Sequence, residues 1–157
     1  MIPAAARTLF IQAIEAELDS LRRFRELLQR EQELLIAGDT DALMGLVTRK
    51  SELHQQLQGQ HDALARLLGE HGIVPSPEAV RQLCEGLPGA LASWDALLAL
   101  GNEVRALNEL NGSLIAERMQ NNQAALSVLL AAADQPTLYD AGGTARPTGR
   151  GRHLGSA

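Results

Sequence analysis

Aromatic residues are scarce in this sequence of 157 residues, which has two phenylalanines, one tyrosine and one tryptophan. The chain is nevertheless 45% apolar, which is enough for a single domain to bury a core. That core must therefore consist mainly of leucine and alanine, the usual filling of long helices. Cysteine is also nearly absent. Because Cys84 has no second cysteine to pair with, an intrachain disulfide is excluded, a reducing compartment is the simplest setting, and a small buried hydrophobe is its expected role.

Basic residues are also fewer than acidic ones: the sequence has 14 Lys and Arg and 19 Asp and Glu, which gives a net charge of −5. This balance argues against a nucleic-acid-binding body, which would draw on clustered Lys and Arg. No apolar run approaches the ~20 residues that a membrane span needs, and residues 1–20 carry three acidic side chains where a signal peptide would be apolar. We therefore expect a soluble, cytoplasmic protein with no membrane insertion.

Residue patterns for catalysis are missing too. His54 and His61 share a helix face, but no cysteine or carboxylate completes a ligand set at metal spacing. Glu70 and His71 lie at a helix end, where surface exposure explains them. No glycine loop precedes a lysine as phosphate binding requires. The sequence therefore predicts no enzyme, no metal site and no cofactor.

The chain does contain leucine repeats at heptad spacing. Residues 4–37 and 40–71 each predict a long helix, with six apolar residues among eight seam positions. The first seam consists of Ile11, Ile14, Leu18, Leu21, Arg25, Leu28, Gln32 and Leu35, and the second of Leu43, Leu46, Lys50, Leu53, Leu57, Gln60, Leu64 and Leu67. Gly38 and Asp39 between them predict a left-handed stop and a helix cap. So short a connection makes the two helices an antiparallel hairpin.

Two breaks divide the following residues. Pro75 and Ser76 precede a short helix at 77–85, whose first residue is Pro77, and residues 86–89 end it before a third long helix from about 90 to 133. Residues 134–157, rich in Gly, Thr and Pro, have no apolar period and predict a flexible tail. The predicted fold is thus all-α: an elongated antiparallel bundle of three long helices plus one short helix in domain 1–133, with a disordered C-terminal tail at 134–157.

The third long helix is the most informative stretch. Its apolar stripe is interrupted by polar side chains in the middle, and the stripe consists of Val104, Leu107, Asn111, Leu114, Arg118, Asn121, Ala125 and Val128. Such residues weaken a closed core, but they give register and direction to a paired helix. The alternative is a surface edge of an ordinary bundle.

Three stretches of this region and the tail resemble the FlgN family of bacterial flagellar export chaperones. They read NELNGSLIAER at 108–118, NQAAL at 122–126 and LYDAGGT at 138–144. The earlier hairpin, with its Gly38-Asp39 turn, also fits, so the resemblance covers most of the chain.

The resemblance implies a cytoplasmic chaperone that binds the C-terminal helical segments of the hook-filament junction proteins. It would prevent premature assembly and deliver these clients to the flagellar type III export gate, with the export ATPase complex as a further partner. The implied client-binding residues are Asn108, Asn111, Leu114, Ile115, Arg118, Asn122, Leu126 and Leu129. Leu138 and Tyr139 are implied to dock on the cytoplasmic domain of the gate, while the role of Arg146, Arg150 and Arg152 stays open.

Two other classes fit parts of the sequence. A structural coiled-coil scaffold protein would use the same heptad faces to associate with itself. A small nucleic-acid regulator would act through the arginines of the tail and would bind in a steeply salt-dependent way.

Overall fold

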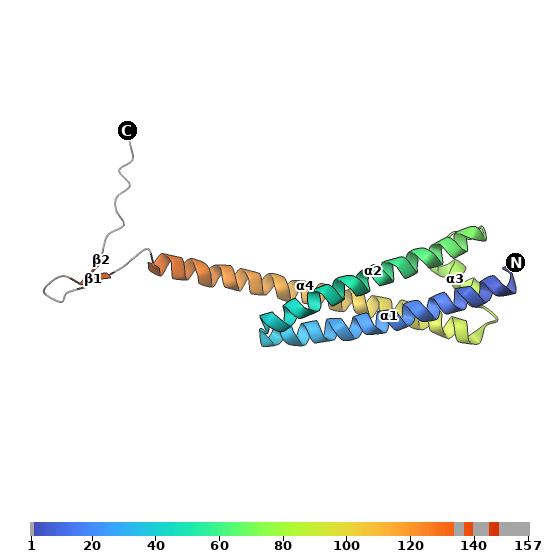
Figure 1. The fold of residues 1–157 in the computed structure, drawn as a ribbon, viewed down its shortest axis with the longest axis horizontal. Helices are drawn as coiled ribbons and strands as arrows, with labels where there is room; N and C mark the ends of the chain where they lie inside the picture. Colours follow the sequence, from blue (N-terminus) through green and yellow to red (C-terminus); the bar gives the residue numbers. More distant parts are fainter. Residues whose placement is uncertain (1, 134–136, 140–144, 148–157) are drawn as a thin grey trace, which may run out of the picture. The chain divides into compact units, whose positions relative to one another are not determined.

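The computed structural model describes residues 2–133, 137–139 and 145–147. It contains four helices, α1 (Ala4–Ala37), α2 (Thr40–Glu70), α3 (Pro77–Cys84) and α4 (Pro88–Ala133), and two strands, β1 (Thr137–Tyr139) and β2 (Ala145–Pro147) (Figure 1). The prediction of a helical chain is confirmed, and three of the four described helices are long. Residues 1–113 form one compact unit and residues 114–157 a second one, and each unit is described by itself below.

The α1–α2 hairpin has the predicted turn. Gly38 ends α1 in the left-handed conformation with φ 73°, which only glycine adopts at little cost. Asp39 caps α2, because its carboxylate accepts a hydrogen bond from the Ala42 amide at 3.1 Å. The two helices then pack side by side and antiparallel (Figure 1). Every residue of the two predicted seams is buried or half-buried, so the heptad spacing identified the packed faces correctly.

The remaining helix ends differ slightly from the prediction. α2 and α3 each end one residue earlier than expected, at Glu70 and Cys84, and Gly72 and Gly86 follow them with φ of 72° and 82°. α4 begins at Pro88 and not near residue 90, because proline lacks only the amide hydrogen that a first helical residue does not use. α4 then continues without interruption through Gly101 and Gly112.

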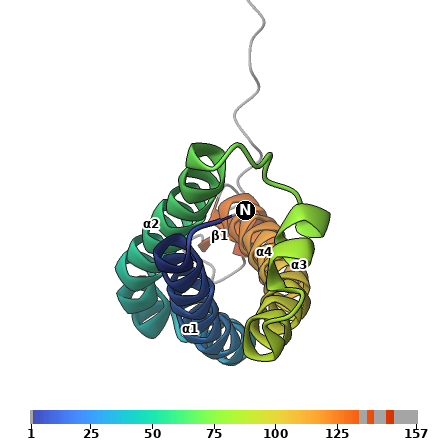
Figure 2. The same ribbon diagram turned by 90° about the vertical axis from the view of Figure 1, so that its right-hand side faces the viewer.

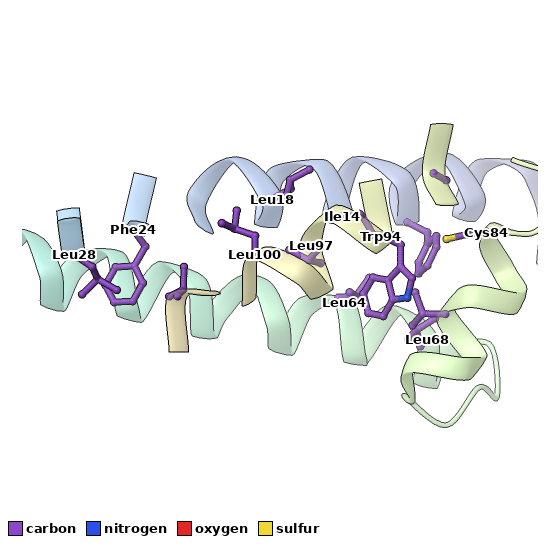
Figure 3. Close-up of a cluster of buried hydrophobic side chains, with 14 residues drawn as sticks. Ile14, Leu18, Phe24, Leu28, Leu64, Leu68, Cys84, Trp94, Leu97 and Leu100 are labelled. Carbon is purple, nitrogen blue, oxygen red and sulfur yellow. The ribbon is translucent and has the colours of Figure 1, made fainter. Parts of the chain in front are cut away.

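The core of residues 1–113 combines apolar side chains of all four helices. Trp94 at the start of α4 packs among Leu64, Leu68 and Cys84, as Figure 3 shows. Burial raises the pKa of the Cys84 thiol, and Asp95 adds to that effect. The expectation that Cys84 is a packing residue is therefore confirmed, since a buried thiol held protonated is a poor nucleophile, and Trp94 is buried in the same core.

The predicted tail contains a short hairpin that the sequence did not indicate. β1 and β2 pair antiparallel, with Leu138 opposite Arg146 and Tyr139 opposite Ala145. The other tail residues, 134–136, 140–144 and 148–157, lie outside the described residues, so the prediction of a flexible tail stays a prediction. The same holds for any role of Arg150 and Arg152.

Candidate partner-binding helix

The two halves of α4 differ in burial. Its buried residues all lie between residues 90 and 111 and are Ala90, Trp94, Leu97, Leu100, Val104 and Asn111. Leu114 is half-buried, and every residue from 115 to 133 is exposed. The candidate site is therefore the exposed half, and Asn111 is the last buried residue before it.

Asn111 is fully buried and its amide group is hydrogen-bonded to α1. Its Nδ2 donates to the Leu28 carbonyl at 2.8 Å and to Glu31 Oε1 at 2.9 Å. Lys50 of α2 donates to both oxygens of Glu31 at 3.0 and 3.1 Å. A side chain from each long helix thus meets at one buried point. The Asn111 Oδ1 atom has no hydrogen-bond partner among the described residues.

This arrangement makes Asn111 a register residue. A polar group in an apolar helix seam costs stability in any alignment where it has no partner, so the correct alignment is favoured. The prediction that Asn111 fixes register thus has a physical basis in the core of residues 1–113. As a contact for a client, however, Asn111 is out of reach in this structure, because its side chain has no exposed surface.

The exposed half of α4 carries many large apolar side chains. Met119, Leu126 and Leu129 are 58%, 56% and 67% exposed, and Ile115, Val128 and Leu130 are exposed with them. No charged residue occurs from residue 119 to residue 133, a helical length of roughly 22 Å. Exposed apolar surface of this extent is typical of a binding site.

Six residues of this half follow one another at alternating spacings of four and three, which places them on one face of the helix. We call them the α4 stripe: Ile115, Met119, Asn122, Leu126, Leu129 and Ala133. Leu130 widens the stripe, while Val128 lies on another side of the helix.

The structure brings together four of the expected client-binding residues on the α4 stripe, namely Ile115, Asn122, Leu126 and Leu129. Asn108 is exposed two turns before Ile115 on the same face. Leu114 and the exposed Arg118 lie beside the stripe rather than on it, and Asn111 is in the core. Sequence reasoning missed Met119, although its spacing from Ile115 and Asn122 would have found it.

The residues expected to dock on the export gate are in β1, which contains Leu138 and Tyr139. Arg146 belongs to β2, and the Gly142-Gly143 pair lies outside the described residues. Within the parts of the chain that the structure describes, no helix is long and apolar enough to cross a membrane. In the same parts, no three His, Cys, Asp or Glu side chains cluster as a metal ion would require.

The fold and the α4 stripe define a helical protein whose longest described helix ends in an exposed apolar segment, without charge from residue 119 to residue 133. The family model described as "FlgN protein" matches residues 1–147, and the chain belongs to the FlgN family. The chain is 27% identical over 135 residues to the flagella synthesis protein FlgN of Proteus mirabilis, an alignment that covers 86% of this chain and 88% of that protein. No solved structure matches the chain significantly. A role in flagellum synthesis follows from the family.

Proposed function

We propose that this protein is a cytoplasmic export chaperone of the bacterial flagellum. It binds the C-terminal helical segments of the hook-filament junction proteins along the α4 stripe, prevents their premature assembly and delivers them to the type III export gate. The observation that carries the proposal is the uncharged face on which Met119, Leu126 and Leu129 are more than half exposed.

The α4 stripe has the features of a helix-pairing face. Its apolar residues recur at heptad spacing, so an amphipathic helix can lay its own apolar face along it. Fully burying a leucine or methionine side chain contributes about 1.5–3 kcal/mol, so the partly exposed side chains of the stripe can together offset the cost of association. Asn122 lies in the middle of the stripe and would fix the alignment of the client helix.

Substitution of Leu126 with aspartate tests the client-binding face. The new charge would be buried in the complex, so Leu126→Asp should weaken binding of the client's C-terminal segment about 10- to 100-fold. Calorimetry with the full chain and the segment measures the affinity. Because Leu126 is exposed in the free protein, the fold should be unaffected.

Ala124→Asp is the matched control, since Ala124 is exposed on the opposite side of the same helix. It adds the same charge to α4 but should leave client affinity within about twofold of the unmodified protein. Equal weakening by both substitutions, or by neither, would contradict the assignment of the α4 stripe.

Delivery to the gate would use the strand segment that follows α4. Tyrosine suits a docking residue, because it offers a large rigid apolar face and loses little rotamer entropy when it is buried. We assign this step to Leu138 and Tyr139, and we assign the cytoplasmic domain of the gate and the export ATPase complex as the partners at that stage.

A self-associating scaffold is the second candidate, because the heptad spacing of the α4 stripe would serve equally for pairing with a second copy. Light scattering separates the two functions. A chaperone should form a defined complex with the client segment, whereas a scaffold should self-associate stably at low concentration and keep that state when the segment is added.

A further inference from the structure

A cavity of about 450 Å³ lies within residues 1–113, apart from the α4 stripe. All four helices contribute to its wall, which is mostly apolar and includes Leu57, Leu64, Leu97 and Trp94. Ligand sites in proteins have this size and this mixture of an apolar wall with a few polar groups. In the end-on view, α2 and α3 stand apart from each other (Figure 2).

The dimensions of the cavity select a narrow occupant. Its lining extends from His54 to Leu68 on α2 and from Trp94 to Arg105 on α4, which corresponds to roughly 16–21 Å. A volume of about 450 Å³ over that length gives an average cross-section of roughly 20–30 Å². A single hydrocarbon chain fits a cross-section of that size.

The directions of α2 and α4 relative to α1 show which lining residues lie at the same end of the cavity. α2 runs antiparallel to α1, with His61 beside Glu17. α4 runs in the same direction as α1. Arg25 of α1 pairs with Glu103 of α4 at 3.4 Å, and the later α1 residue Leu28 accepts a hydrogen bond at its carbonyl from the later α4 residue Asn111. Early residues of α2 and late lining residues of α4 therefore lie at the same end.

The end nearer the α1–α2 turn is cationic, and the other end is apolar. His54 and Arg105 line the first end, and Arg105 has no carboxylate partner among the described residues. Trp94 and Leu68 line the second end together with Val80 of α3. This cationic end is an exception in a chain whose net charge is −5.

One acidic residue, Glu17, lies in the wall between the two ends. Burial raises the pKa of its carboxyl group, and the neighbouring His61 partly opposes that shift. The His61 Nδ1 atom is 3.6 Å from the Glu17 carboxylate, so this acidic group has its own cationic neighbour. Because Glu17 is paired with His61, it does not compete with a ligand for Arg105 at the cationic end.

We propose that this cavity binds a single-chain aliphatic carboxylate. The hydrocarbon chain lies along Leu64 and Leu97 toward Trp94, and the carboxylate is bound by Arg105, whose planar guanidinium pairs with carboxylates through two parallel hydrogen bonds. His54 adds a second hydrogen-bonding group at that end.

Decanoate is a suitable probe, and Trp94, the single tryptophan, reports on its binding. Titration of the full chain below the micelle concentration should change the Trp94 emission saturably. Ala65→Phe fills the cavity wall and should weaken binding at least about tenfold, whereas Ala63→Phe, on the exposed side of the same helix, should change it less than about twofold. Arg105→Gln should weaken binding about 3- to 10-fold.

Two comparisons can overturn the proposal without any variant. Decylammonium has the same chain with the opposite charge, and binding as tight as that of decanoate would refute the carboxylate site. Bromine quenches tryptophan emission at close range, so decanoate brominated at its terminal carbon should quench Trp94 more than decanoate brominated beside the carboxylate. Equal or reversed quenching would refute the orientation, and no saturable response to decanoate would refute the site.

Discussion

Asn111 is the residue whose replacement tests the packing of the three long helices most directly. Asn111→Ala removes the 2.8 Å bond to the Leu28 carbonyl and the 2.9 Å bond to the Glu31 carboxylate. A neutral hydrogen bond contributes about 0.5–1.5 kcal/mol and one to a charged group about 1.5–3 kcal/mol. The substitution also removes the buried Oδ1 atom, which has no hydrogen-bond partner, and this offsets part of the lost stability. We therefore expect the free energy of unfolding to fall by about 2–4 kcal/mol, and Tm to fall by roughly 5–15 °C.

Thermal and urea unfolding, followed by circular dichroism, would measure this loss. Asn108→Ala is the matched control, because Asn108 is the same residue type on the same helix but exposed, and its replacement should cost less than about 0.5 kcal/mol. If the two variants were equally stable, the buried network of Asn111, Glu31 and Lys50 would have no role in stability, and the reasoning above would be wrong.

Asn111→Asp extends the test to pH. The substitution keeps the shape of the side chain but places a second carboxyl group against Glu31, so the pKa of the introduced group should rise in the folded state. A carboxyl whose pKa is higher in the folded than in the unfolded state binds more protons when folded. The variant should therefore regain stability relative to Asn111→Ala as the pH falls, and lose it as the pH rises through that raised pKa.

Three further predictions concern other parts of the chain. Burial raises the pKa of Glu17, so its ionised form destabilises the fold. Glu17→Gln should therefore be more stable than the unmodified chain near neutral pH, and the difference should shrink as the pH falls. Unfolding titrations at several pH values would measure this difference. Gly38→Ala should cost about 1 kcal/mol because φ is 73°, whereas Gly45→Ala, in open space within α2, should stabilise by about 0.5–1 kcal/mol, and equal effects in urea unfolding would contradict the turn geometry. Tyr139→Ala should weaken binding to the cytoplasmic domain of the gate while leaving client affinity unchanged, and calorimetry with each partner would expose a loss of both or of neither.

Much of the fold could be predicted from local patterns. The heptad seams of α1 and α2 repeat over many turns, and Gly38 with Asp39 has a turn chemistry that few other pairs offer. Boundaries were less certain where a residue suits two roles. Pro88 can end one segment or begin a helix, and only the packing of the residues around it decides which.

The candidate site was predicted only in part, because burial depends on partners that are distant in sequence. Asn111 and Asn122 are both amides within apolar stretches of one helix, and nothing local distinguishes them. Asn111 is buried because Glu31, distant in sequence, meets it, whereas Asn122 is exposed. The cavity beside Trp94 could not be predicted at all, since it is a space left between helices rather than a property of any one of them.

The exposed half of α4 also has a consequence for the abundance of the protein. An uncharged helical segment, residues 119–133, that displays leucine, valine and methionine resembles the surface of an unfolded chain, which cellular quality control recognises and degrades. Under the proposed function, a bound client would cover this surface and protect the protein from proteases. The supply of clients would then set the lifetime of their carrier, and unneeded copies would be removed without a dedicated regulator.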